Sequence, residues 1–131
     1  MSFRLVWLPG DGVGPEVARA ARVVLDAVSD RFSLSFAHSE SDLGGIAIDR
    51  HGDPFPAETR AAVASADSVF LGAVGGPKWD VGTIRPESGL LALRKALGVF
   101  ANIRPVKVFE GLEARSPLTP ERARGVDLVI I

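Results

Sequence analysis

The chain has 131 residues, of which 47% are hydrophobic and 24% are charged, and its net charge at pH 7 is −1. These values are typical of one modest soluble domain and leave no basic excess for binding nucleic acid or an anionic membrane. The absence of Cys excludes disulfides and thiolate metal sites. No apolar run approaches the roughly 18 residues of a membrane span, and no signal-peptide pattern is visible, so we expect a cytoplasmic protein.

The first third of the chain predicts a strand, a tight turn and a helix. Residues 3–8 form an apolar run that gives way to three Gly and two Pro between residues 9 and 15. Pro15 suits a first helical turn. The apolar residues that follow recur at helical spacing and predict one buried helix face: Val17, Ala21, Val24 and Val28. Residues 32–36 then alternate apolar and polar side chains, which predicts a half-buried strand.

The middle of the chain predicts two loops, two helices and a strand. Residues 39–56 are polar and rich in Gly, so we expect mostly loop there. Residues 56–66 predict a short helix, residues 69–74 a compact strand, residues 75–83 a long loop, and residues 88–97 a second helix. Loops of this length inside a compact domain are usually functional or mobile.

The last third predicts extended structure around one short helix. Pro105 limits residues 100–109 to an edge or irregular strand, and Thr119 with Pro120 predicts a helix start. Residues 126–131 resemble a buried strand with no turn or polar residue after it, so we expect the N-terminal piece of a longer protein. The alternative is a genuine C-terminal strand that pairs in a sheet.

The alternation of strands and helices predicts an α/β fold with a largely parallel, open sheet. In such sheets ligands bind at the carboxyl ends of the strands. Residues 10–15, Gly-Asp-Gly-Val-Gly-Pro, are not the G-x-G-x-x-G pattern of a Rossmann site, because the third Gly comes one place early and Pro15 follows it. We therefore expect a tight turn that lines a ligand cleft, and not a true Rossmann fold.

The Gly-Gly-Pro-Lys-Trp-Asp segment at residues 75–80 is a candidate ligand contact. It follows a predicted strand, and adjacent Gly residues allow the backbone to approach a ligand closely. An ordinary surface loop with Trp79 packed on it explains the same residues equally well.

The helix at residues 88–97 predicts a mixed ligand-binding face. Residues three and four apart are neighbours on a helix, so one face combines an acid, aliphatic groups and a guanidinium: Glu87, Leu90, Leu91 and Arg94. Arg94, and Arg104 on the next element, each suit a carboxylate because a guanidinium donates two parallel hydrogen bonds. The alternative is that both Arg side chains are solvated and that the Leu side chains are core.

Together these segments resemble the isocitrate/isopropylmalate dehydrogenase family of β-decarboxylating dehydrogenases, and within it the enzymes that act on 3-isopropylmalate. The resemblance covers the whole chain and rests on segments in matching order: residues 8–17, 44–45 with 48–49, 75–80, 84–87, 90–95 and 100–105. It implies an isopropylmalate-dehydrogenase-like open sheet, incomplete in this chain. It also implies NAD-dependent oxidative decarboxylation of 3-isopropylmalate to 4-methyl-2-oxopentanoate in leucine biosynthesis, Mg²⁺ or Mn²⁺ as a further cofactor, and a homodimer.

The resemblance assigns roles to individual residues. Arg94 and Arg104 match side chains that bind the malate carboxylates, and Leu90 and Leu91 match residues that hold the isopropyl group. Relatives specific for isocitrate or homoisocitrate carry polar residues in that region. Glu87 matches a residue beside the nicotinamide ribose, and the implied cofactor contacts are Gly76, Pro77, Lys78, Trp79, Asp80, Val81, Gly82, Thr83, Ile84, Arg85, Pro86 and Glu87. This loop is shorter here than in the family between Asp80 and Ile84.

The resemblance also implies that the chemical machinery lies outside this chain. The family's general acid–base Tyr and Lys and its metal-binding Asp residues have no counterparts here, so residues 1–131 alone are expected to be inactive. Residues 1–99 would be the first half of a discontinuous cofactor and substrate domain, and residues 100–131 the start of a dimerisation domain. The alternatives are a tartrate, malate or homoisocitrate dehydrogenase relative and, from another class, a non-catalytic α/β binding module.

Overall fold

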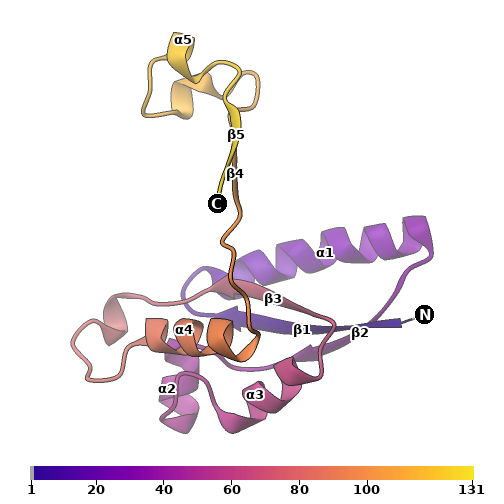
Figure 1. The fold of residues 1–131 in the computed structure, drawn as a ribbon, viewed down its shortest axis with the longest axis vertical. Helices are drawn as coiled ribbons and strands as arrows, with labels where there is room; N and C mark the ends of the chain where they lie inside the picture. The colour runs from indigo at the N-terminus through magenta and orange to yellow at the C-terminus, as the bar shows by residue number, and fades with distance from the viewer. Residues whose placement is uncertain (1) are drawn as a thin grey trace. The chain divides into compact units, whose positions relative to one another are not determined.

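A three-stranded parallel sheet organises the first part of the chain in the computed structural model, which describes residues 2–131. The chain divides into a first unit that ends at Gly98 and a second unit from Val99 to Ile131. The first unit contains β1 (Ser2–Gly10), α1 (Gly14–Phe32), β2 (Ser35–Glu40), α2 (Gly45–His51), α3 (Ala57–Ala64), β3 (Ser68–Ala73), the 3₁₀ turn η1 (Pro77–Trp79) and α4 (Pro86–Ala96) (Figure 1). The second contains β4 (Arg104–Lys107), the 3₁₀ turn η2 (Glu113–Arg115), α5 (Pro120–Ala123) and β5 (Asp127–Ile130).

Strand β1 lies at the centre of the sheet, in the order β2-β1-β3, because both of its faces are apolar. Alternate side chains of a strand point to opposite faces. Leu5 and Trp7 pack with Ala18 of α1 on one face. Val6 and Leu8 pack on the other face with Leu43, Phe55, Val63 of α3 and Leu93 of α4. Helices therefore cover both faces, as a parallel sheet requires (Figure 1).

The structure confirms the α/β class, the parallel sheet and most of the elements predicted for the first unit. The predicted strands at residues 3–8 and 69–74 are β1 and β3, and the predicted helices at residues 56–66 and 88–97 are α3 and α4. Pro15 lies in the first turn of α1, as its fixed backbone angle predicts.

Helix α1 differs from the prediction at its end and in its buried face. The strand predicted at residues 32–36 exists but is misplaced: the helix continues to Phe32, Ser33 takes a left-handed conformation, and β2 begins only at Ser35 and extends to Glu40. The predicted burial of Val17 and Val24 is also wrong, since both are exposed. The buried residue is Ala18, with Ala21 and Leu25 packed against the same cluster. A small side chain at residue 18 allows the helix to approach Trp7, which moves the buried stripe by one residue.

The predicted loop at residues 39–56 contains a helix, so that expectation is wrong in part. Helix α2 spans Gly45–His51 and ends at Gly52, which has a positive φ of 71°. Its first two backbone N–H groups donate to the carboxylate of Asp11, 34 and 35 residues earlier in the chain. A helix stabilised by so distant a partner leaves little local signal in the sequence.

The second unit contains an antiparallel strand pair, formed by the segments for which the sequence predicted an edge or irregular strand and a buried strand. Residues 104–107 of β4 pair with residues 127–130 of β5 in antiparallel register. Most of the strand predicted at residues 126–131 is therefore paired, at residues 127–130, but it is not buried as predicted, and Ile131 is 87% exposed. Thr119 and Pro120 begin α5 as expected. The assignment of residues 1–99 and 100–131 to a discontinuous domain and a dimerisation domain stays a prediction.

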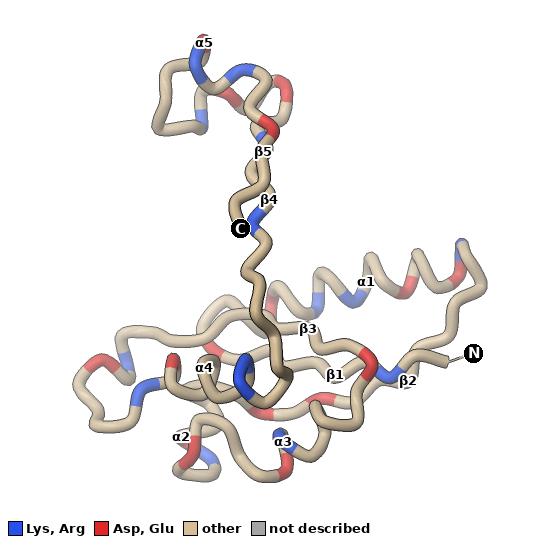
Figure 2. The backbone as a smooth tube through the Cα atoms, viewed as in Figure 1, with Lys and Arg blue, Asp and Glu red and all other residues tan. Residues whose placement is uncertain are grey.

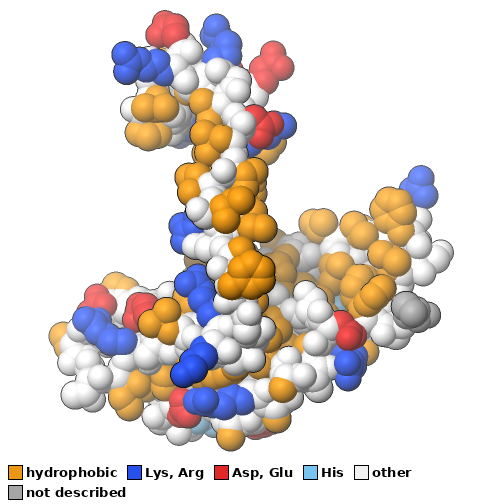
Figure 3. Space-filling view, in the orientation of Figure 1, with side chains coloured by type: hydrophobic (Ala, Val, Ile, Leu, Met, Phe, Trp, Pro, Cys, Tyr) orange, Lys and Arg blue, Asp and Glu red, His pale blue; other side chains and the backbone are white. Residues whose placement is uncertain are grey.

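The surface mixes charges of both signs and carries exposed apolar groups. Basic and acidic residues are interspersed along the backbone of each unit (Figure 2). Apolar side chains are exposed along α1, including Val23 and Phe32, and along β4 and β5, including Val106 and Val129 (Figure 3). Among residues 2–131, no helix combines the length and the apolar character needed to cross a membrane.

The ion pair between Arg4 of β1 and Asp67 at the start of β3 predicts acid-sensitive stability. The Arg4 backbone N–H donates to Asp67 Oδ2 at 2.7 Å, and the guanidinium lies 3.2 Å from Oδ1. The hydrogen bond from the Arg4 side chain lowers the pKa of the Asp67 carboxyl below its ordinary value of 3.8. A carboxyl group whose pKa is lower in the folded state than in the unfolded state stabilises the fold at pH values above its unfolded-state pKa. This stabilisation is lost as the pH falls through the folded-state pKa.

Asp67→Asn is therefore expected to reduce the loss of stability on acidification below about pH 4. Urea unfolding midpoints at pH 7 and pH 3 measure the effect. Asp26→Asn, which alters an exposed acid on α1, is the matched control. An equal pH dependence in wild type and Asp67→Asn would contradict the prediction.

Candidate functional site

The carboxylate of Asp11 joins three segments at the carboxyl ends of the strands. Asp11 follows β1 directly and is only 3% exposed. Its Oδ2 accepts hydrogen bonds from the backbone N–H groups of Gly45 at 2.7 Å and Gly75 at 2.8 Å, and its Oδ1 accepts from Ile46 at 2.7 Å. These bonds offset the cost of burying a charge, and a negative charge at the start of α2 complements the helix dipole.

The Gly-rich turn before α1 is a packing feature. A Cβ atom at Gly14 would lie 2.0 Å from the Pro9 carbonyl oxygen and 2.8 Å from the Ala73 backbone N. Only Gly therefore allows the start of α1 to pack directly on the ends of β1 and β3. The backbone of this turn therefore packs against the ends of β1 and β3 at Gly14. This packing explains why the spacing of its Gly residues differs from that of a dinucleotide-binding motif.

Helix α4 has a buried face and an exposed face that separate the predicted substrate residues from the core. Pro86, Gly89 and Leu93 are buried. Leu91 is 62% exposed and Arg94 is exposed, while Leu90 is half-buried. The prediction that the Leu side chains are core therefore holds for Leu93 and fails for Leu91. Exposed Leu91 and Arg94 are three residues apart, which makes them neighbours on the helix surface.

The predicted cofactor segment begins in contact with α4 and α2. A Cβ atom at Gly75 would lie 2.6 Å from Glu87 Oε1, so the Glu87 carboxylate lies against the Gly75 backbone. Lys78 and Trp79 donate from their side chains to Asp49 in the last turn of α2, the latter at 3.2 Å. The hydrogen bond from Lys78, followed by that from Trp79, lowers the pKa of the Asp49 carboxyl below its usual range. Trp79 thus packs on protein, as the surface-loop alternative predicted.

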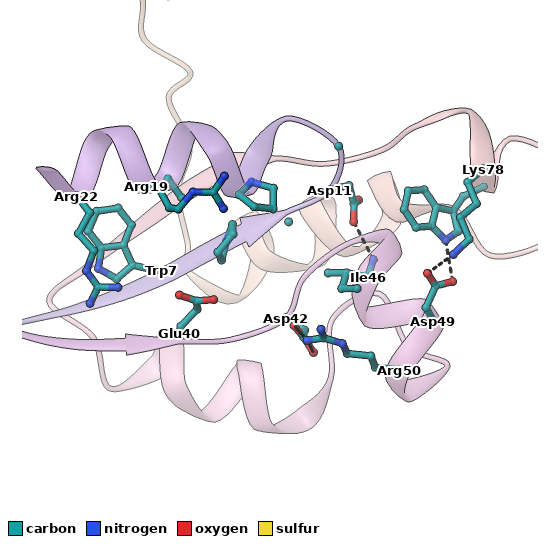
Figure 4. Close-up of a pocket in the computed structure, with 16 residues that line it drawn as sticks. Trp7, Asp11, Arg19, Arg22, Glu40, Asp42, Ile46, Asp49, Arg50 and Lys78 are labelled. Atoms are coloured by element: carbon teal, nitrogen blue, oxygen red, sulfur yellow. Dashed lines mark hydrogen bonds and ion pairs between the residues drawn. The ribbon is translucent and has the colours of Figure 1, made fainter.

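A pocket of about 610 Å³ lies beside the Asp11 turn, between α1, α2 and the η1 loop (Figure 4). Its lining combines basic, acidic and aromatic side chains that include Trp7, Arg19, Arg22, Glu40, Asp42, Asp49, Arg50 and Lys78. Arg22 lies over the Trp7 ring at 5.3 Å from its centroid, and the Trp7 indole donates to His38 Nδ1 at 2.9 Å. Such a lining suits a polar ligand that carries both hydrogen-bond donors and acceptors.

The sequence analysis missed most of this pocket. Of the predicted cofactor residues, only Lys78 and Trp79 line it, and none of the predicted substrate residues does. The available signal was the pair Arg19 and Arg22, which share a helix face just after a Gly-rich turn. Arg104 lies on β4 in the second unit. Its predicted role, like the roles of Leu90, Leu91 and Arg94, stays a prediction.

Known proteins match the chain along its whole length. A family model described as isocitrate/isopropylmalate dehydrogenase matches residues 4–131. The chain belongs to the isocitrate/isopropylmalate dehydrogenase family. It is 53% identical over 132 residues to the 3-isopropylmalate dehydrogenase of Salinibacter ruber, and 53% identical over 133 residues to that of Bacillus subtilis. These matches cover 99% and 100% of this chain but 36% of each relative, so the chain spans little more than a third of their length.

Solved structures of the family share the fold at lower identity. A β-decarboxylating dehydrogenase from Thermococcus kodakarensis matches 98% of this chain and 32% of its own, with 31% identity and a TM-score of 0.70. An isocitrate dehydrogenase from Methylococcus capsulatus matches 83% of this chain and 30% of its own, with 30% identity and a TM-score of 0.70. The arrangement of strands and helices is therefore that of the family.

Asp11→Asn is expected to lower the free energy of unfolding by about 1.5–3 kcal/mol, the range for hydrogen bonds to a charged group. The amide removes the charge and turns an NH₂ group toward a backbone N–H that has no other acceptor. Urea unfolding measures the loss. Asp53→Asn is the control, because Asp53 accepts one local bond, from the Phe55 N–H at 2.9 Å. Equal losses in the two variants would contradict the special role of Asp11.

Proposed function

We propose that residues 1–131 are the N-terminal part of an NAD-dependent 3-isopropylmalate dehydrogenase that acts in leucine biosynthesis. The exposed face of α4 carries the proposal. It presents an aliphatic side chain, Leu91, beside a guanidinium, Arg94. On the opposite face of the helix, Leu93 packs in the hydrophobic core. Membership of the family and the names of the most similar relatives support the same substrate.

The chemistry of these side chains suits 3-isopropylmalate. Arg94 is able to donate two parallel hydrogen bonds to a carboxylate, and Leu90 and Leu91 offer an apolar surface to the isopropyl group. A carboxylate or hydroxyl in the place of that group would lose water without gaining a partner on these Leu side chains. By the resemblance, Arg104 binds the substrate as well. The residues of this chain thus bind and orient the substrate.

The segment from Gly76 to Glu87 has groups that fit NAD. The Glu87 carboxylate is exposed at the start of α4, where its oxygens are able to accept hydrogen bonds from ribose hydroxyls. The loop before it offers exposed backbone and the cation of Lys78. NAD held there would supply the hydride acceptor for oxidation of the carbon that bears the substrate hydroxyl. These residues would hold the cofactor beside the face of α4.

The residues described do not by themselves fit a divalent cation. Among residues 2–131 no group of three or more His, Asp or Glu side chains is placed to hold a metal ion. The proposed Mg²⁺ or Mn²⁺, and the general acid and base, would use residues beyond this chain. We also propose an isopropylmalate-dehydrogenase sheet distinct from a true Rossmann fold, and a homodimeric, cytoplasmic enzyme.

A chimaera tests the proposal. In it, residues 1–131 replace the segment of Bacillus subtilis 3-isopropylmalate dehydrogenase that they match. Absorbance of NADH reports activity with 3-isopropylmalate, and Arg94→Ala is expected to raise the KM for that substrate and lower kcat, because a charge-assisted contact of about 1.5–3 kcal/mol is lost. The KM for NAD should change much less.

Lys95→Ala is the matched control, since Lys95 is the exposed neighbour of Arg94 on the same helix. Circular dichroism verifies that each protein is folded. Preference for tartrate, malate or homoisocitrate would assign the chain to another branch of the family. A folded chimaera without activity on any of these substrates would favour a non-catalytic module. Normal kinetics in Arg94→Ala would exclude Arg94 from the substrate site.

Leu91→Asn in the chimaera is expected to lower kcat/KM for 3-isopropylmalate more than kcat/KM for malate, because only 3-isopropylmalate carries an alkyl group. Burial of such a group is worth roughly 1.5–3 kcal/mol, so the ratio of kcat/KM values should fall by about tenfold or more. Since Leu91 is 62% exposed, the change removes little core packing. Leu97→Asn, just past α4, is the control. Equal losses for both substrates would mean that Leu91 acts through packing alone.

A further inference from the structure

We infer that Asp49 is a positioning residue that holds the loop of residues 75–80 in place for the cofactor. The inference rests on the proposed function, because the loop is proposed to contact NAD. Asp49 lies in the last turn of α2 and belongs neither to the loop nor to the proposed substrate face. It would therefore act through Lys78 and Trp79.

Helix α2 presents one face to the loop. Gly45 and Asp49 are four residues apart, which places them on the same side of the helix. A Cβ atom at Gly45 would lie 2.3 Å from the Trp79 ring, so the indole packs directly on the helix backbone there. One turn later, Asp49 Oδ1 accepts the indole N–H of the same Trp79 at 3.2 Å. The ring is thus held by packing at one point and by a hydrogen bond at another.

The second oxygen of Asp49 extends the contact to the preceding residue of the loop. Asp49 Oδ2 accepts from the Lys78 ammonium (Figure 4). The same ammonium lies 5.2 Å from the centroid of the Trp79 ring, in reach of a cation–π interaction. One carboxylate therefore engages two consecutive side chains of the loop, and these two side chains also interact with each other.

Asp11 holds the other side of this assembly. Its carboxylate binds the first turn of α2 and the Gly75 N–H, where the loop begins. The loop is consequently bound to α2 at its start through Asp11 and at residues 78–79 through Asp49. Its Gly75 backbone also meets Glu87 of α4. A change at Asp49 would release the middle of the loop and leave its start in place.

The exposure of the pair separates a positioning role from a contribution to global stability. The side chain of Asp49 is 33% exposed and that of Lys78 is 66% exposed. Ion pairs this accessible to water add little to the free energy of unfolding. The loss of Asp49 should therefore alter the local order of the loop and leave the unfolding of the whole unit almost unchanged.

The experiment compares Asp49→Ala and Asp49→Asn with Asp53→Asn in the chimaera. Asp53 is the matched control, because it follows the end of α2 and its carboxylate also pairs locally, with the Phe55 N–H at 2.9 Å and with Arg60 at 3.8 Å. Among the described residues, Asp53 does not line the pocket and its side chain makes no hydrogen bond to the loop. Hydrogen exchange and kinetics are therefore compared between two aspartates of which one engages the loop. Hydrogen exchange of residues 75–80 is followed by mass spectrometry, and KM and kcat are measured for both substrates.

Asp49→Ala is expected to speed exchange in residues 75–80 and to raise the KM for NAD by about three- to fivefold, the fold-change equivalent to an exposed ion pair. The KM for 3-isopropylmalate should stay within experimental error. Asp49→Asn keeps an oxygen for the Trp79 indole, so it should show a smaller effect, and it provides the comparison if Asp49→Ala folds poorly. Asp53→Asn should match wild type in both measurements.

Unchanged exchange in the loop of both Asp49 variants would overturn the inference. So would equal increases in the KM values for NAD and 3-isopropylmalate, because a general loosening predicts both. Hydrogen exchange does not require activity. A chimaera that fails to reduce NAD while exchange in the loop still depends on Asp49 would refute the proposed function and the role of Asp49 in positioning the loop for the cofactor. The structural contact between α2 and the loop would still stand.

Discussion

The buried carboxylate of Asp11 is the interaction on which the arrangement of the first unit depends. A charge that is 3% exposed persists only where hydrogen bonds replace the lost water, and here three backbone N–H groups do so. Because these donors belong to α2 and to the segment after β3, one side chain at the end of β1 sets the positions of both. The pocket beside α1 and the loop of residues 75–80 follow from that placement.

Helix α4 combines a buried face that completes the core with an exposed face to which we assign the substrate. Its buried residues include Gly89, where a Cβ atom would lie 2.5 Å from the Pro54 carbonyl oxygen, so the helix packs backbone to backbone against the segment between α2 and α3. Leu93 completes the core. With one face engaged in this way, Leu91 and Arg94 remain accessible to solvent. The side chains of the outer face can therefore vary without a change in the core.

The comparison with solved relatives fits this division. Structures with about 30% identity keep the fold, with TM-scores of 0.70, although their names refer to β-decarboxylation in general or to isocitrate. The conserved architecture therefore belongs to a family with more than one substrate. In this chain the side chains on the exposed face of α4 favour an apolar substituent, and this local chemistry, rather than the fold, supports the proposal of 3-isopropylmalate.

The sequence by itself determined the elements whose signals are local. The apolar run of β1, Pro15 at the start of α1, and the periodic Leu residues of α4 each depend on neighbours in the chain, so the α/β class and the parallel sheet were predictable. The sequence also indicated the family, because several short segments occur in the family's order.

Only the tertiary structure decided the features that depend on distant partners. Helix α2 was missed because its first N–H groups are bonded by Asp11, which lies 34 residues away from Gly45. The buried stripe of α1 was misplaced because it is set by the approach of Ala18 to Trp7. The contact of Asp49 with Lys78 and Trp79 joins residues about 30 positions apart. Periodicity describes which faces a helix has, but the partner across space determines which face is buried and which residues form a site.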